Sequence, residues 1–153
     1  MTSQPTVTPT DLDDLVAMTR EAASAYIGGD MRRYFDLMRH TEDFTLMSPF
    51  GGDATRESTS SITAERIAEL EDYFRGGECD LEVVETYASG DLAVLVVVER
   101  QHGVVGHLPA QDWSLRVTLV FRREQGAWRL VHRHADPLVH PITYDRLAEL
   151  ARG

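Results

Sequence analysis

WSLRVTLVFRREQGAWRLVHRHADP, at residues 113–137, is the most informative segment of this chain. Its first half, residues 113–123, alternates apolar side chains with mostly polar ones, and its second half keeps the same period of two. Such alternation of β-branched and aromatic residues is typical of β-strands. The residues between the halves, 124–126, fit a three-residue loop in which Gly126 supplies the left-handed conformation. The segment therefore predicts a β-hairpin.

The register of this hairpin determines which polar side chains share a face. A three-residue loop predicts four cross-strand pairs, which are Arg122 with Trp128, Val120 with Leu130, Thr118 with His132, and Arg116 with His134. One face of the hairpin would then carry an apolar patch near the turn and the polar groups of the last two pairs farther along. A shift of one residue would separate the arginine from the histidines, because neighbouring side chains in a strand point to opposite faces.

The remaining patterns predict helices first and strands afterwards. A first helix is expected to begin at Thr10, with Asp13 in an approximate capping box, and to end at the glycines at 28–29. A second, shorter helix is expected after Asp30, a third over 63–75 and a fourth over 143–151. Strands are expected over 42–48, 80–88 and 92–101, in addition to the hairpin, and the polar segment 53–61 is expected to be a loop. Helices followed by an antiparallel meander predict an α+β domain in which one sheet wraps around the helices.

The composition limits the classes of partner. The chain has 153 residues, 42% hydrophobic and 26% charged, which is ordinary for one globular domain. We expect a flexible arm over residues 1–9 and a single domain over 10–153. The formal net charge of −10 disfavours nucleic acid and anionic membrane surfaces as partners, since both attract clustered Lys and Arg.

Cys79 is the one cysteine of the sequence, so no disulfide can form within the chain. We expect it to be a small core residue in a reducing compartment. No apolar run is as long as a membrane span, and the polar N-terminus lacks the apolar core of a signal peptide. The expected location is the cytoplasm.

Four motifs resemble the nuclear transport factor 2-like superfamily, in particular its SnoaL-like branch. They are GGD at 28–30, SPFGG at 48–52, SGDLAVL at 89–95 and RVTLVFRREQGAWRLVHRHADP at 116–137. The resemblance covers the chain from about residue 10. It implies a cone-shaped, strongly curved antiparallel sheet around three N-terminal helices, a deep pocket, and a homodimer formed through the outer sheet face. Members include isomerases, cyclases, epoxide hydrolases, dehydratases, kinase association domains and non-catalytic binders, so the fold does not choose the function.

One departure from this family argues against steroid isomerisation. In ketosteroid isomerases an aspartate general base precedes a Pro-x-Gly turn, and the corresponding position here resembles Ser48. Serine cannot take a proton from carbon near neutral pH without an activating base. Tyr26 lies on the first helix, but about one turn too late to match the tyrosine of those isomerases.

His132 and His134 are the most suggestive catalytic candidates. Residues i and i+2 of a strand point the same way, so the two imidazoles can converge on a ligand, a proton or a metal ion. A zinc site would need a third ligand, which His102, Glu99 or Asp136 could supply, and no spacing forces this. The alternative is structural, with one histidine in the core and the other partly exposed. We expect neither a metal nor a cofactor.

Arg116 and Asp136 complete the predicted catalytic set. A guanidinium inside an apolar cone needs an anionic partner, either an internal carboxylate or a carboxylate ligand. The alternative is a solvated arginine on a strand. Asp136 could orient His134, or it could begin the turn at Pro137.

Aromatic residues and a few polar groups are expected to line the pocket. The predicted ligand-binding residues are Tyr26, Tyr34, Phe44, Met47, Phe50, Phe74, Tyr87, Glu99 and Thr118. Such a set suits a small hydrophobic, oxygenated molecule of polyketide or steroid type. The leading hypothesis is therefore ligand binding, with acid–base isomerase, cyclase or dehydratase chemistry as its catalytic form. The alternative is a non-catalytic dimerisation or ligand-sensing module, in which the cone is filled by its own side chains.

Overall fold

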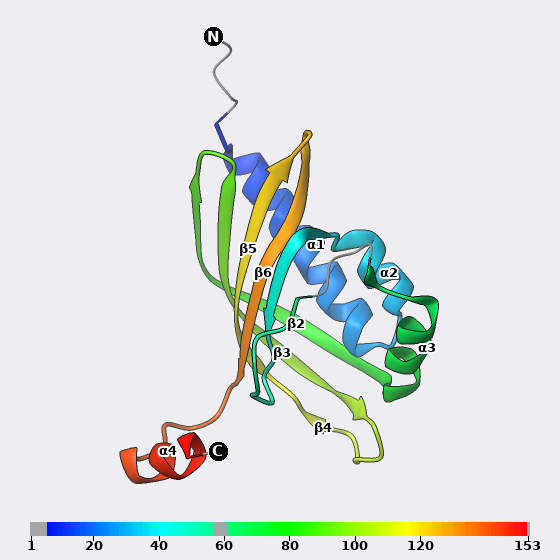
Figure 1. Cartoon of the computed structure of the whole chain (residues 1–153), viewed down its shortest axis with the longest axis vertical. Coiled ribbons are helices and arrows are strands. Elements are labelled where there is room, and N and C mark those ends of the chain that lie inside the picture. Colours follow the sequence, from blue (N-terminus) through cyan, green and yellow to red (C-terminus); the bar gives the residue numbers. More distant parts are fainter. Residues whose placement is uncertain (1–5, 57–60, 153) are drawn as a thin grey trace.

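A curved, open sheet packs around three helices in the computed structural model, which describes residues 6–56 and 61–152 (Figure 1). The elements are, in order, α1 (Pro9–Ile27), α2 (Met31–Leu37), β1 (His40–Met47), α3 (Ala64–Tyr73), β2 (Phe74–Ser89), β3 (Leu92–Val105), β4 (Gln111–Asp112), β5 (Leu115–Glu124), β6 (Ala127–Pro137) and α4 (Tyr144–Ala151). This arrangement confirms the predicted α+β class and the cone-like wrapping of the sheet around α1, α2 and α3. No helix in the described part is long and apolar enough to cross a bilayer.

The sheet is mixed, whereas an antiparallel sheet was predicted. Its strand order is β1-β6-β5-β3-β2, and the short β4 pairs with β3. The pairs β2–β3, β3–β5 and β5–β6 are antiparallel, but β1 lies parallel to β6. After β1 the chain continues into α3 and not into a hairpin, so β1 does not pair with the next strand in the sequence. It lies at the edge of the sheet, beside β6.

A single core lies between α1 and the concave face of the sheet. Leu95, Leu119 and Phe121 are fully buried on this face, opposite Leu15 and Ala22 of α1. Because alternate residues of a strand share a face, the buried positions of β3 and β5 are the odd-numbered ones. This parity defines the inner face of the sheet, which faces the helices, and the outer face, which carries the even-numbered positions of these strands.

Two glycines let α1 approach β2 and β3 closely. Gly77 pairs with Gly103, and a Cβ atom on Gly77 would lie 2.5 Å from the His102 carbonyl oxygen and 2.8 Å from Cγ1 of Ile27. The glycines at 76–77 were predicted to follow a helix over 63–75 and to precede a strand at 80. They lie instead inside β2, which starts directly after α3 ends at Tyr73.

Helix α1 begins two residues earlier than predicted. Thr8 is the N-cap, its Oγ1 accepts a hydrogen bond from the Asp11 N–H at 3.1 Å, and Asp11 Oδ2 accepts one from the Thr8 N–H at 2.9 Å. The predicted pair of Thr10 and Asp13 is wrong, because Pro9 suits the first helical position, where its missing N–H costs nothing. The expected arm over residues 1–9 is shortened accordingly, and its residues 1–5 lie outside the described part.

The turn between β5 and β6 contains two residues, not three. Gln125 and Gly126 both have positive φ, at 52° and 79°, and Glu124 pairs with Ala127. Two successive left-handed residues form a type I′ turn, whose twist matches that of the flanking strands. The predicted three-residue loop is therefore wrong, and the shorter turn shifts the register beside it by one residue.

A β-bulge in β6 then shifts the register again. Leu130 pairs with Phe121, but the next pair joins His132 to Val120, which leaves Val131 as an extra residue. The pairs that follow are Thr118 with His134 and Arg116 with Asp136, so all four predicted pairs are wrong. The four polar side chains Arg116, Thr118, His132 and His134 nevertheless share one face, because the bulge reverses the change of face that the shorter turn introduced.

We predict that Thr8→Ala lowers the free energy of unfolding by about 1 kcal/mol, because the mutation removes the side-chain acceptor of the capping box. Urea unfolding followed by circular dichroism measures this loss. Thr10→Ala is the matched control and should change little, because Thr10 lies inside the first turn and caps nothing. A larger loss for Thr10→Ala would contradict the assigned cap.

We also predict that Gly126→Ala lowers the free energy of unfolding by about 1–2 kcal/mol, because an alanine resists the left-handed conformation. Gln125→Asn should be neutral or stabilising, since asparagine is favoured at the first central position of this turn. Thermal unfolding of both variants tests the assignment. A loss for Gln125→Asn as large as that for Gly126→Ala would argue against the two-residue turn.

Candidate functional site

A cavity of about 820 Å³ lies between the helices and the inner face of the sheet. Its walls come from α1, α2, α3 and all six strands, and its rim includes the loop after β1 and the segment that follows β6. Eight aromatic residues line the cavity, and they are Tyr26, Tyr34, Phe35, Phe44, Phe50, Tyr73, Phe74 and Trp113.

A buried ion pair lies on the cavity wall. Arg133 Nη1 and Nη2 donate to the two carboxylate oxygens of Glu99, each at 2.8 Å, and the two side chains are only 19% and 4% exposed. Both residues line the cavity. Burial disfavours the charge of Arg133, but the attraction and hydrogen bonds of Glu99 outweigh this and raise the pKa of Arg133 above its ordinary value. The pair therefore places two opposite, mutually neutralised charges inside an apolar space.

The bulge in β6 places Arg133 on the inner face. Before the bulge the inward residue of β6 is the even-numbered Leu130, and after it the inward residues are the odd-numbered Arg133 and Ala135. Arg133 pairs across the sheet with the buried Leu119. Glu99 follows Val97 on the inner face of β3, so the two charged side chains come from strands on either side of β5.

Aromatic rings pack around the ion pair and give the cavity its shape. The Tyr26 ring lies edge-on to Tyr34 and Phe74, with centroids 4.9 and 4.7 Å apart, and His40 stacks on Phe44 at 3.8 Å. Burial raises the pKa of the Tyr34 phenol above its ordinary value, so this group is neutral near pH 7. A neutral phenol can both donate and accept a hydrogen bond.

A second polar group of residues lies toward β4. Gln101 donates from Nε2 to the Trp113 carbonyl at 3.1 Å, and the Trp113 indole N–H donates to the Gly103 carbonyl at 3.1 Å. The Asp112 carboxylate accepts from the Ser114 N–H at 2.9 Å, and this hydrogen bond lowers the pKa of Asp112. These bonds fix the orientation of the Trp113 ring at the cavity wall.

Six of the residues predicted to bind a ligand line this cavity, and they are Tyr26, Tyr34, Phe44, Phe50, Phe74 and Glu99. Met47, Tyr87 and Thr118 do not line it. Met47 and Tyr87 are exposed, and Thr118 pairs with Val96 on the outer face. Tyr87 pairs with Val94 on the same face. Their predicted place in the pocket is wrong because the bulges in the strands and the parity of the sheet direct them away from the helices.

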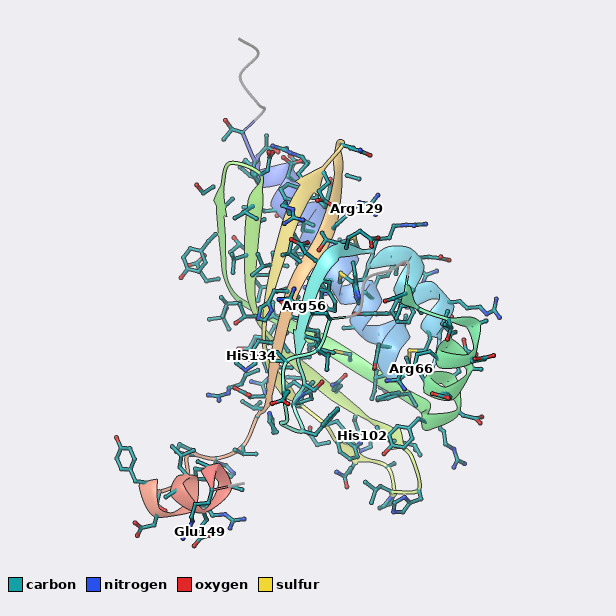
Figure 2. All side chains as sticks on the ribbon, viewed as in Figure 1. Arg56, Arg66, His102, Arg129, His134 and Glu149 are labelled. Carbon is teal, nitrogen blue, oxygen red and sulfur yellow. The ribbon has the colours of Figure 1, made fainter. Side chains whose placement is uncertain are left out.

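The four predicted catalytic residues also lie on the outer face. Three of them contact each other there, since Arg116 and His134 each lie 3.4 Å from a carboxylate oxygen of Asp136. The fourth, His132, has its Nδ1 2.8 Å from Oγ1 of Thr45. In Figure 2 His134 lies on the side of the sheet away from the helices, whereas Arg66 lies on α3. The prediction that Arg116, His132, His134 and Asp136 supply the polar groups of the pocket is wrong, since the bulge directs Arg133 inward in their place.

Two other chemistries find little support in the geometry. Among residues 6–56 and 61–152, no three His, Cys, Asp or Glu side chains gather as a metal site would require. Burial raises the pKa of the Cys79 thiol to about 12, so it stays protonated near neutral pH and is a poor nucleophile.

Sequence reasoning missed Arg133, Gln101 and Trp113 as wall residues. In the structure Leu130 and Ala135 are both fully buried although they lie five positions apart, which the sequence alone does not reveal. An odd separation cannot keep both residues on one face of a regular strand, so it indicates a bulge between them. The buried Glu99 then required a cation on the inner face, and the bulge makes Arg133 that cation.

We predict that Glu99→Gln lowers the free energy of unfolding by about 3–5 kcal/mol, because it leaves the buried Arg133 charge without its partner. Glu82→Gln is the matched control, since Glu82 lies 2.8 Å from Arg100 in a half-exposed ion pair. This control should change stability by less than about 1 kcal/mol. Urea unfolding of both variants makes the comparison, and equal losses would show that the inner pair is not special.

Solved structures resemble this fold over most of its length. A candidate dehydratase of the nuclear transport factor 2-like family from Streptomyces avermitilis superposes with a TM-score of 0.66 at 19% identity, covering 87% of this chain and 100% of that one. A protein of the same superfamily from Salmonella enterica gives 0.67 at 15% identity, with 87% and 94% covered. The association domain of Caenorhabditis elegans CaMKII gives 0.60 at 18% identity, with 83% and 95% covered. At these identities the likeness concerns the fold.

A search among curated proteins finds no match to this chain. A model of the SnoaL-like domain family matches residues 15–139, which span most of α1, all of α2 and α3, the cavity and every strand described above. The chain therefore belongs to the SnoaL-like domain family.

Proposed function

We propose that this protein binds a small hydrophobic, oxygenated molecule in the cavity between α1 and the sheet. The observation that carries the proposal is the combination of an aromatic-walled space of about 820 Å³ with a buried Glu99–Arg133 pair on its wall. Pockets that enclose small organic ligands commonly measure about 300–1,000 Å³ and combine apolar walls with a few polar groups. A ligand of polyketide or steroid type meets both conditions.

The charges in the wall favour a neutral ligand. Glu99 and Arg133 neutralise each other, so a ligand carboxylate would have to compete with Glu99 for the guanidinium. A guanidinium carries five N–H groups, and Glu99 engages two of them in the bonds given above. A carbonyl or hydroxyl oxygen on the ligand can accept from another of these groups without separating the pair. Tyr34 offers a second, neutral hydrogen-bonding partner nearby.

The catalytic form of this proposal is a cofactor-independent proton transfer within the same cavity. Glu99, His40 and Tyr34 are the titratable groups that line its inner part, and they replace the outer-face residues as the candidates. The Streptomyces avermitilis relative, a candidate dehydratase, gives one reaction class to assay. A ligand-sensing module is the non-catalytic form of the proposal, and it too would bind a ligand in this cavity. The cavity argues against the alternative of a non-catalytic module whose cone is filled by its own side chains.

We also propose a homodimer through the outer face of the sheet, as the family resemblance implies. Four half-buried valines form a band there, and they are Val94, Val96, Val98 and Val120. Acidic residues of β2, Glu82 and Glu85, flank one side of the band, and His134 with Arg116 flank the other. Two copies related by an axis along the strands would place the acidic side of each opposite the basic side of its partner.

The single cysteine supports a reducing compartment, such as the cytoplasm, as the location.

The binding test uses Trp113 as a reporter, because its ring lies on the cavity wall. In a Trp128→Phe background it is the one remaining tryptophan of the sequence. We expect saturable quenching of its fluorescence by a hydroxyanthraquinone or a steroid ketone. The double variant Glu99→Leu/Arg133→Leu removes the polar groups together, and it should weaken binding by about 10–100-fold, since hydrogen bonds to charged groups contribute about 1.5–3 kcal/mol.

Arg116→Leu is the matched control, because Arg116 is an arginine of the same sheet on its outer face. It should leave the dissociation constant unchanged. An absence of saturable quenching by these compounds, or an equal effect of Arg116→Leu, would overturn the proposal. Circular dichroism of each variant confirms that it is folded before the titration.

A further inference from the structure

Helix α4 carries an apolar face that the rest of the fold leaves uncovered. At 100° per residue its apolar side chains fall within one arc, and they are Tyr144, Leu147, Ala148, Leu150 and Ala151. The opposite arc carries Asp145, Arg146, Glu149 and Arg152, with Arg146 and Glu149 joined at 2.8 Å. Tyr144 is 91% exposed, and Leu147 and Leu150 are also exposed. We call the first set the apolar face of α4.

This helix needs a surface to pack against. It contains eight residues, and Figure 1 shows it apart from the body of the protein, beyond the end of β6. Isolated helices shorter than about 12–15 residues are marginal in water, because their stability comes mainly from packing of an apolar face. The arrangement of polar and apolar residues on α4 therefore indicates a docked state.

The rim of the cavity offers a matching apolar surface. Four large hydrophobic residues that line the cavity are themselves exposed, and they are Phe50, Tyr73, Leu108 and Val139. Phe50 is 89% exposed, although its ring belongs to the cavity wall. We call these four residues the apolar rim. They come from the loop after β1, from the end of α3, from the loop after β3 and from the segment that follows β6.

The chain leaves the sheet at this rim. Leu138 donates its N–H to the Ser114 carbonyl at 2.9 Å, and both residues line the cavity. Residues 139–143 then connect this anchor to the first residue of α4. Five residues span at most about 16–18 Å when extended, and a helix of eight residues is about 12 Å long. The anchor and the tether thus keep α4 within reach of the rim of its own chain.

We propose that α4 docks with its apolar face on the apolar rim of the same chain and closes the cavity. The docked helix covers the exposed rings of the rim and leaves its own charged arc toward water. A short tether gives an effective concentration in the millimolar range, which exceeds that of a second copy at micromolar protein. This argument favours the chain's own rim over the rim of a partner. The role as a lid rests on the proposed ligand site, but the docking itself does not.

Disulfide trapping tests the docking without any ligand. In a Cys79→Ser background, which removes the one native thiol, Leu108→Cys is combined with Leu147→Cys, and in a second protein Phe50→Cys is combined with Leu150→Cys. Under mild oxidation at micromolar protein, we expect disulfides within one chain, detected as monomers by non-reducing electrophoresis and peptide mass mapping. They should form about 100-fold faster than links between chains, in keeping with the tethered concentration.

The matched control pairs Leu108→Cys with Glu149→Cys, which lies on the charged arc of the same helix. This protein should form the disulfide at least about tenfold more slowly, because the docked helix directs Glu149 away from the rim. Equal rates for Leu147→Cys and Glu149→Cys, or no disulfide in either test protein, would overturn the docking. If covalent dimers are the main product, α4 docks on the rim of a second copy and not on the rim of its own chain. Either failure leaves the Trp113 titration as an independent test of the ligand site.

Discussion

The interior of this fold depends on one extra residue in β6. Without the bulge at Val131, the inward positions of β6 would continue from Leu130 to His132 and His134, and two imidazoles would enter the cone. With it, Arg133 enters and meets Glu99 at 2.8 Å. An inward Glu99 without a cation would be strongly unfavourable in this apolar space, so the bulge and the acidic residue on β3 depend on each other.

This dependence explains why the two faces of the sheet differ so sharply. The inner face combines large buried apolar residues with the neutralised Glu99–Arg133 pair, and the outer face carries histidines, Arg116 and Asp136 around a band of valines. The inner face suits a ligand that is mostly apolar and has few oxygens. The outer face suits a protein surface with complementary charge. One sheet thus separates the proposed binding space from the proposed association surface through the alternation of its side chains.

The sequence was sufficient for the class of fold and for much of the cavity wall. Alternation and capping signals placed the helices and strands near their observed positions, and Tyr26, Tyr34, Phe44 and Phe74 were recognised as candidates for the wall. Glu99 was recognised as well, but its partner Arg133 was not, because the direction of Arg133 depends on register. A two-residue turn at Gln125 and a bulge at Val131 each change the face of all residues that follow, and neither has a strong local signal.

The parallel pairing of β1 with β6 also has a consequence for how the protein is made. The residues it joins, such as His40 and Leu130, lie about 90 positions apart in the chain. Contacts of such long range carry a high loop-closure cost and slow folding. During synthesis on the ribosome, β1 has no strand to pair with until the final strand has emerged. The wall that β1 contributes, which includes Phe44 and Leu46, is therefore completed last.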